Sequence, residues 1–195
     1  LWEYKCPKKI RASLSGDNEK VYSGCDDGFL YAINQNNGKL IWKFFTGNVI
    51  TAAPVIKNGK IFVGSYDDYF YSISADSGFM LWKFNSGAPI IGGAAIDDST
   101  VYFGNLAGTL FALDQSSGEL IWQYRTGSNL NSAPFVTKNH ILVGSFDRKV
   151  RLLEKRSGNI LWETTMEGRI KTTPIIWNNY LLICSEDYDI TLFKF

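Results

Sequence analysis

The sequence predicts an all-β protein, a β-propeller of five four-stranded blades, and three observations support this. Five of the six tryptophans recur every 40 residues, at Trp2, Trp42, Trp82, Trp122 and Trp162. A glycine stands four residues before each of the last four tryptophans, at Gly38, Gly78, Gly118 and Gly158. Aromatic residues make up 15% of the chain and there are 18 glycines, which is typical of many short strands joined by tight turns. A fixed period of this length indicates a repeat architecture.

Each repeat is predicted to contain four short strands. In the second repeat we expect strands at 50–56, 60–65, 69–74 and 80–84. These segments are rich in β-branched and aromatic residues, whereas the segments between them hold Asn, Asp, Ser and Gly, which favour turns. Connections this short join antiparallel strands, so each repeat is predicted to be a meander. Four-stranded repeats of about 40 residues are typical of propeller blades.

The two ends of the chain are predicted to complete one blade together. Five repeats of 40 residues would occupy 200 positions, and the chain has 195. The missing positions correspond to 36–40, the turn between a third and a fourth strand. Residues 1–4 are therefore predicted to form the outer strand of a blade whose other three strands lie within 170–195. We expect a single closed five-bladed domain over 1–195, in preference to a fragment of a larger ring, and we expect a monomer.

Composition argues against several classes of partner. The chain carries 20 Lys+Arg and 19 Asp+Glu, a net charge of +1, which argues against nucleic-acid binding through bulk charge. Its apolar runs are far shorter than the roughly 18 residues that a membrane helix needs. The three cysteines, Cys6, Cys25 and Cys184, are odd in number and scattered, so they form neither a disulfide framework nor a zinc pattern.

The line A-x-[DNS]-x-x-[TSN]-G-x-x-[LI]-W recurs along the chain and carries a family resemblance. It stands at 32–42, from Ala32 to Trp42, and again at 112–122. It resembles the tryptophan-docking motif of the PQQ-like (quinoprotein-type) propeller repeats, and the resemblance covers the whole chain. That family includes dehydrogenases, outer-membrane assembly scaffolds and sensor domains, so it implies the fold more strongly than the function. It also implies a periplasmic or secreted location.

The motif residues are interpreted as structural. Gly38, like the equivalent glycine of the other repeats, permits the positive φ of a tight turn. The tryptophan that follows offers a large apolar face between neighbouring blades, with one N–H that needs an acceptor. The tryptophans at 2, 42, 82, 122 and 162 and the glycines at 38, 78, 118 and 158 are therefore predicted to hold blades together.

Neither a cofactor nor a catalytic set is predicted. The resemblance implies that a quinone dehydrogenase would have eight blades, a tryptophan under the quinone, a vicinal disulfide and acidic calcium ligands. This chain has no Cys-Cys pair, and its extra Trp177 is expected in a turn, so PQQ is not expected. The single histidine, His140, is expected in an exposed turn without nucleophilic partners. We predict that the chain is not an enzyme; a PQQ- or metal-dependent redox enzyme, or a fragment of one, stays the alternative.

Acidic residues recur in the loop between the second and third strands of the repeats. They are Asp26, Asp27, Asp67, Asp68, Asp147, Glu186 and Asp187. Such pairs could bind a hard cation. Because the loop recurs as a hairpin turn in every blade, we favour Asx turns and expect no metal.

A candidate binding surface lies where these loops and the loops entering each first strand share one face. If the ring closes, Lys8, Lys9, Arg11, Arg169 and Lys171 converge into one basic sector. The candidate ligand-binding residues are Lys9, Arg11, Asn131, Arg169, Lys171, Tyr66, Phe146 and Tyr188. Converging Arg and Lys can form charge-assisted hydrogen bonds with an anion, and aromatic residues beside them are typical of protein interfaces. A salt-bridged, solvated rim is the alternative interpretation.

These observations favour a non-enzymatic binding or scaffold propeller. We expect it to recognise a protein, a peptide or a small anionic ligand on the loop face at the channel mouth. A ligand-sensing domain of a larger receptor is a further alternative.

Overall fold

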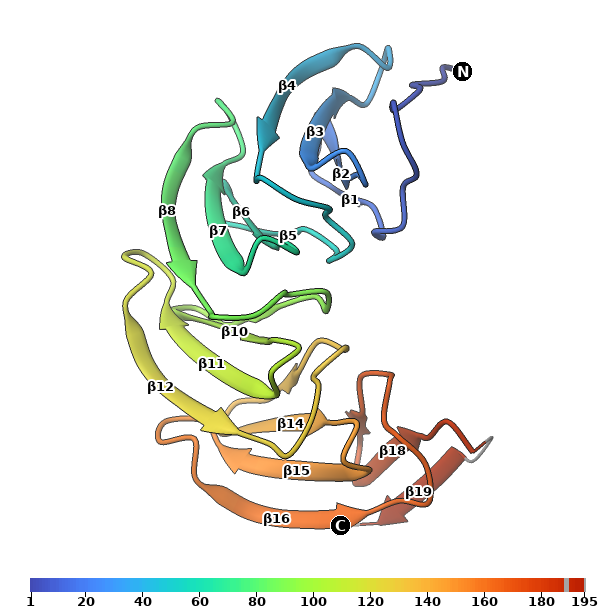
Figure 1. Ribbon diagram of the computed structural model, residues 1–195, viewed down its shortest axis with the longest axis vertical. Helices are drawn as coiled ribbons and strands as arrows, with labels where there is room; N and C mark the ends of the chain where they lie inside the picture. The colour runs from blue at the N-terminus through green and yellow to red at the C-terminus, as the bar shows by residue number, and fades with distance from the viewer. Residues whose placement is uncertain (188–189, 195) are drawn as a thin grey trace. The chain divides into compact units, whose positions relative to one another are not determined.

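The computed structural model describes residues 1–187 and 190–194, and in this part of the chain all regular structure is β (Figure 1). The chain divides into two compact units, Leu1–Ala94 and Ala95–Phe195, which are described separately. Among the described residues, no helix has the length and apolar character needed to cross a membrane.

The first unit contains two four-stranded antiparallel sheets. Blade 1 has the order β1-β2-β3-β4, with β1 at Ser15–Gly16, β2 at Lys20–Gly24, β3 at Phe29–Asn34 and β4 at Leu40–Phe45. Blade 2 has the order β5-β6-β7-β8, with β5 at Val55–Lys57, β6 at Lys60–Gly64, β7 at Tyr69–Ser74 and β8 at Met80–Asn85. Each sheet is the predicted meander, because neighbours in the sequence are neighbours in the sheet.

The second unit contains the other three sheets, of which two have four strands. Blade 3 comprises β9 (Ala95–Ile96), β10 (Thr100–Gly104), β11 (Thr109–Asp114) and β12 (Leu120–Arg125). Blade 4 comprises β13 (Phe135–Val136), β14 (His140–Gly144), β15 (Lys149–Glu154) and β16 (Ile160–Thr165). Blade 5 comprises β17 (Ile175–Trp177), β18 (Tyr180–Cys184) and β19 (Ile190–Lys194), three strands among the described residues. Trp177, which we expected in a turn, is the last residue of β17.

The innermost strands are shorter than the sequence predicts. We expected a strand over 50–56 in the second repeat, and the structure has β5 at Val55–Lys57. Pro54 precedes it, and a proline has no N–H to donate to a sheet ladder. The segment before β5 is nevertheless packed, since Ile50 and Ala52 are buried. Ile50 lies directly against Gly24 of blade 1, where a Cβ would come within 2.3 Å of its side chain.

The N-terminal segment packs on blade 1 without forming a strand. Residues 1–4 have no strand assignment, although we expected them to be an outer strand. The indole Nε1 of Trp2 donates to the Gln35 carbonyl at 2.7 Å, and its ring lies on Gly38. Trp2 therefore occupies the place that an outer-strand tryptophan takes against the next blade. Closure of the last blade by this segment stays a prediction.

The same docking contact recurs within each unit. Trp42 of blade 1 lies on Gly78 of blade 2 and donates to the Ala75 carbonyl at 3.2 Å. Trp122 of blade 3 lies on Gly158 of blade 4 and donates to the Lys155 carbonyl at 3.0 Å. Both glycines have positive φ, 74° and 73°, so their lack of a Cβ serves both the turn and the ring above it.

Alternate residues of the middle strands form the core. In the first unit Tyr22, Leu30, Ile61 and Ile73 are fully buried in one cluster that spans both blades. In the second unit clusters of the same kind join blade 3 to blade 4 and blade 4 to blade 5. The outer strands β4 and β8 bury little, since their residues alternate between exposed and half-buried.

Candidate functional site

In each unit, the loop that enters a blade lies beside the loop between that blade's second and third strands. Backbone N–H groups of the loop between the second and third strands donate to carbonyls of the entry loop at 2.9–3.1 Å. The pairs are Asp26 to Lys9, Tyr66 to Val49, Phe146 to Asn129 and Glu186 to Arg169. These two loops share one end of the strands, which we call the loop face. The turns between the first and second and between the third and fourth strands lie at the other end, the turn face.

The acidic residues of the loop face form Asx turns. The carboxylates of Asp27, Asp67 and Asp147 accept the backbone N–H two residues later at 3.0–3.1 Å. In the described part of the chain no group of three or more His, Cys, Asp or Glu side chains is placed to hold a metal ion. The hydrogen bonds confirm the expected Asx turns at Asp27, Asp67 and Asp147.

Three of the candidate binding residues come together in the second unit. The guanidinium carbon of Arg169 lies 5.6 Å from the centre of the Phe146 ring, and Nζ of Lys171 lies 5.7 Å from it. Both cations also approach Glu186: Arg169 Nε is 4.0 Å from its carboxylate, and Lys171 donates a hydrogen bond to it. The Arg169 and Lys171 side chains are 58% and 49% exposed, so the cluster of Phe146, Arg169, Lys171 and Glu186 faces solvent.

Electrostatics in this cluster favour the charged state of the carboxylate. The hydrogen bond from Lys171 lowers the pKa of Glu186, and the positive charges of Lys171 and Arg169 act in the same direction. With two cations and one carboxylate, the cluster keeps a positive excess beside an aromatic ring. Such a surface can bind a carboxylate through charge-assisted hydrogen bonds while the ring contacts an apolar group.

The candidate residues of the first unit make their own contacts. Arg11 pairs with Asp26, Nη2 to Oδ2 at 2.8 Å, and the Lys9 carbonyl accepts from the Asp26 N–H. The half-buried Tyr66 carbonyl accepts a 3.5 Å hydrogen bond from the side chain of Asn48. Lys9 and Arg11 belong to one unit and Arg169 and Lys171 to the other, so the basic sector that we expected on ring closure stays a prediction.

Two candidates lie outside these clusters. Asn131 is half-buried just before β13, and its buried side-chain oxygen has no hydrogen-bond partner among the described residues. Tyr188 lies outside the described residues.

Sequence reasoning missed a charge network around the buried Arg151 in blade 4. Arg151 is 5% exposed and donates to both carboxylate oxygens of Asp147, at 3.1 and 2.6 Å. Its Nε lies 3.4 Å from Glu163, close enough for an ion pair but without hydrogen-bond geometry. Lys149 reaches the same glutamate at 2.5 Å. The available signal was that the fourth repeat carries Arg where the first two carry Tyr31 and Tyr71.

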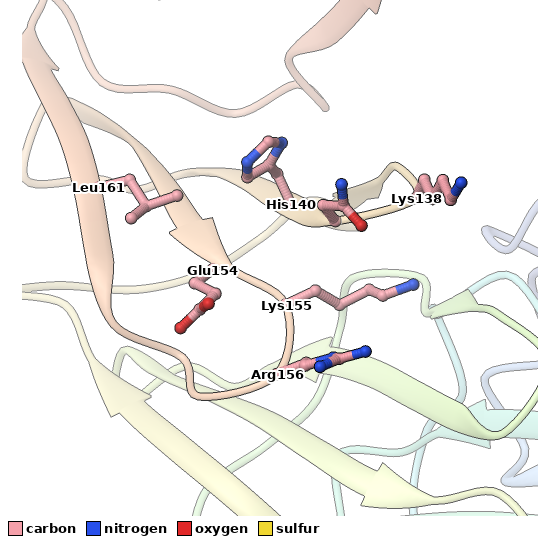
Figure 2. Close-up of a pocket in the computed structure, with 7 residues that line it drawn as sticks. Lys138, His140, Glu154, Lys155, Arg156 and Leu161 are labelled. Carbon is pink, nitrogen blue, oxygen red and sulfur yellow. The ribbon is translucent and has the colours of Figure 1, made fainter.

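Sequence reasoning also missed a hollow of about 640 Å³ on the turn face of blade 4. Lys138, Asn139, His140, Glu154, Lys155, Arg156 and Leu161 line it (Figure 2). We expected His140 in an exposed turn, but it is the first residue of β14 and is half-buried. The signal that could have found the hollow is the Lys155-Arg156 pair, which stands where the other repeats carry uncharged or acidic residues.

Comparison with solved structures places this fold among known propellers. BamB from Moraxella catarrhalis matches with a TM-score of 0.83 and 20% identity, over 95% of this chain and 61% of that one. The computationally designed Ika8 protein matches with a TM-score of 0.84 and 16% identity, over 93% of this chain and 57% of that one. The chain thus spans about three fifths of the length of these structures. No curated protein matches the sequence.

Comparison with family models identifies the repeats themselves. The model described as outer membrane protein assembly factor BamB matches residues 1–89 and 71–187, which together cover most of the sequence. The overlapping matches follow the internal repeat, and the docking motifs anchored at Trp42 and Trp122 lie inside them. The chain belongs to this BamB-type family of PQQ-like β-propeller repeats.

Proposed function

We propose that this chain is a non-enzymatic scaffold module that binds a protein or peptide on its loop face. The observation that carries the proposal is the solvent-facing cluster of Phe146, Arg169, Lys171 and Glu186. Arg and aromatic residues are the types most enriched where proteins contact one another, and the exposed cations can reach a carboxylate on a partner. The family description, an outer membrane protein assembly factor, supports a role in holding other proteins and a location outside the cytoplasm.

The preferred ligand is an acidic segment that also carries an apolar residue. Arg169 and Lys171 supply more positive charge than Glu186 neutralises, and the half-buried Phe146 ring supplies an apolar contact beside them. A small dianion could use the cations but not the ring. The two expectations from the sequence, a peptide and a small anionic ligand, therefore predict different roles for Phe146.

The test is binding of the purified chain to an array of acidic peptides with and without aromatic residues. We expect the Phe146→Ser/Arg169→Ser variant to lose about tenfold or more in affinity for its best peptides. Phe79→Ser is the matched control, because Phe79 is 75% exposed but lies on the turn face of blade 2. Equal binding by the wild type and the double variant would reject the loop face as the site. Full competition by succinate, with no effect of Phe146→Ser alone, would favour the small anion.

A further inference from the structure

We propose that the hollow on the turn face of blade 4 binds a phosphate-bearing ligand through Lys138, Lys155 and Arg156. The site is independent of the loop face, because it lies at the opposite ends of the same strands. Its volume of about 640 Å³ falls in the range of pockets that hold small molecules.

The cationic groups of the hollow extend to one side. In Figure 2 the charged ends of Lys138, Lys155 and Arg156 all project in the same direction, while the Glu154 carboxylate lies on the other side of the turn. Glu154 accepts a 2.5 Å hydrogen bond from the Ser157 hydroxyl, which engages it away from the cations. An anion placed among the three cations therefore meets little opposing charge from Glu154.

Two of these cations are available to a ligand. Lys155 lies 3.1 Å from Asp97, so part of its charge is already compensated. Burial acts to raise the pKa of Asp97, but hydrogen bonds from the Ser99 N–H and Lys155 keep that pKa below its ordinary value. Lys138 and Arg156 have no ion pair with any carboxylate in the described part of the chain. A ligand gains most from these two side chains, because their charge is not yet compensated.

Two hydrogen bonds fix the backbone beneath the site before any ligand arrives. The Lys155 N–H donates to the Asn139 carbonyl at 2.9 Å, which joins the two turns that form the hollow. The Lys155 carbonyl accepts the indole N–H of Trp122, so the docking tryptophan of blade 3 fixes the same residue from the other side. Only the Lys and Arg side chains then have conformational entropy to lose on binding.

The charges are a property of the fourth repeat and are not required by the docking turn. Position 156 is Asn36, Asp76 and Ser116 in the other docking turns. Position 155 is Gln35, Ala75 and Gln115 there, and position 138 is Asn18, Asn58, Asp98 and Asn178 in the other repeats. The turn contacts use backbone atoms at 155, and the ion pair with Asp97 accounts for a lysine there. Neither explains why arginine stands at 156.

The donors fit a phosphate group better than an isolated carboxylate. A guanidinium can bind two phosphate oxygens at once, and two ammonium groups can share the remaining charge. The imidazole of His140 lines the same hollow and offers a further polar contact. A second hollow of about 290 Å³ shares Lys155 and Arg156. Asp97 and Thr100 line it beside Ile121 and Trp122, so a ring that carries hydrogen-bond donors can lie there.

The test is a titration of the full ¹⁵N-labelled chain with inorganic pyrophosphate, followed by amide shifts. We expect saturable shifts at 138–140 and 154–158, and a loss of affinity of roughly tenfold or more in both Arg156→Ser and Lys138→Asn. Both substitutions copy residues found in sister repeats, so the fold should be kept. Arg125→Ser is the matched control, because Arg125 ends β12 at the loop end and loses the same charge.

Vesicles containing phosphatidic acid are the second probe, since a phosphate group can belong to a free ligand or to a lipid headgroup. Saturable binding of pyrophosphate indicates a free ligand, and flotation with the vesicles alone indicates a headgroup; either result must be weakened by Arg156→Ser. The proposal is overturned if neither probe binds, if the shifts map to the loop face, or if Arg125→Ser weakens binding as much as Arg156→Ser.

Discussion

Blade 2 and blade 4 hold the same loop carboxylate with different donors. In blade 2 the hydroxyl of Tyr71 lies 2.7 Å from Asp67. In blade 4 Arg151 takes the equivalent place and binds both oxygens of Asp147. Each aspartate also forms the Asx turn that begins the third strand, so the donor determines how firmly that turn is held.

The two donors differ in what else they require. Burial, together with the hydrogen bond to Asp67, raises the pKa of Tyr71, so the phenol stays neutral and donating. A buried guanidinium keeps its charge and needs compensation. Blade 4 provides it with Asp147 and, at 3.4 Å, with Glu163, which in turn pairs with Lys149. Arg151 in blade 4 therefore belongs to a network of four charged residues, whereas Tyr71 in blade 2 does not need one.

Removing the arginine should have the largest effect. Arg151→Ala leaves Asp147 partly buried without its main partner, and we expect a loss of about 3 kcal/mol in the free energy of unfolding. Tyr71→Phe in blade 2 removes one neutral donor and should cost about 1 kcal/mol. Urea unfolding followed by tryptophan fluorescence measures both.

Arg151→Tyr is the control that converts blade 4 to the blade 2 arrangement. We expect it to retain much of the stability that Arg151→Ala loses, because the tyrosine hydroxyl can reach Asp147 as Tyr71 reaches Asp67. If Arg151→Ala is no more costly than Tyr71→Phe, the arginine does not stabilise the turn more than the tyrosine does.

The docking contact is common to both blades, so its loss should cost the same in each. An Ala Cβ at Gly78 would lie 2.7 Å from Trp42, and at Gly158 it would lie 2.6 Å from Trp122. Positive φ adds strain of about 1 kcal/mol, so we expect a total of about 2 kcal/mol for either substitution.

Gly59→Ala separates the two contributions in the same urea experiment. Gly59 has a φ of 71° but nothing within 4 Å of the added Cβ, so only the backbone strain of about 1 kcal/mol is expected. Equal losses at Gly59 and Gly78 would mean that the tryptophan ring moves aside without cost.

Acid should distinguish the arginine-held carboxylate from its tyrosine-held replacement. Burial acts to raise the pKa of Asp147, but hydrogen bonds from Arg151 and the Lys149 N–H hold that pKa below its ordinary value. A carboxyl with a lowered folded pKa stabilises the protein above its unfolded pKa of about 3.9, and this stability is lost as the pH falls. We expect urea midpoints to fall less steeply below about pH 4 in Arg151→Tyr than in the wild type. An unchanged slope would show that Arg151 does not set this pKa.

The repeat could be predicted because its tryptophans and glycines recur at an even spacing. The 40-residue period, the positive-φ glycine before each of Trp42, Trp82, Trp122 and Trp162, and the strand over 69–74 all appear in the structure as predicted. The short β5 was not predicted, because alternation of apolar residues continues through Ile50 and Ala52, which are buried without a ladder. Burial and strand pairing both produce alternating apolar residues in a sequence. In this segment only Pro54 marks the point after which strand pairing begins.

The candidate sites were harder to predict for a different reason. A repeat pattern draws attention to the positions that its copies share, whereas Arg151, Lys155 and Arg156 are informative because the copies differ there. The grouping of Arg169, Lys171 and Phe146 could be expected from equivalent loop positions alone. Predicting the pairing of Arg151 with Asp147 required knowing which way the side chains of β15 point. Predicting the hollow required the three-dimensional arrangement of the turns of blade 4.

The smallest expected difference lies on the outer edge of the same two blades. In blade 4 the side chains of Lys149 and Glu163 pair at 2.5 Å while 35% and 37% exposed. In blade 2 the equivalent residues are Tyr69 and Lys83, so the lysine stands on the other strand of the pair. Nζ of Lys83 lies 4.5 Å from the centre of the Tyr69 ring. We expect Lys149→Met and Tyr69→Leu each to cost about 0.5 kcal/mol. Salt screens an exposed ion pair, and Tyr69 also packs on the core of its unit, so the loss in blade 4 should shrink at high ionic strength while the loss in blade 2 persists. Urea midpoints at low and high salt decide this, and an equal salt response would mean that packing stabilises both edges.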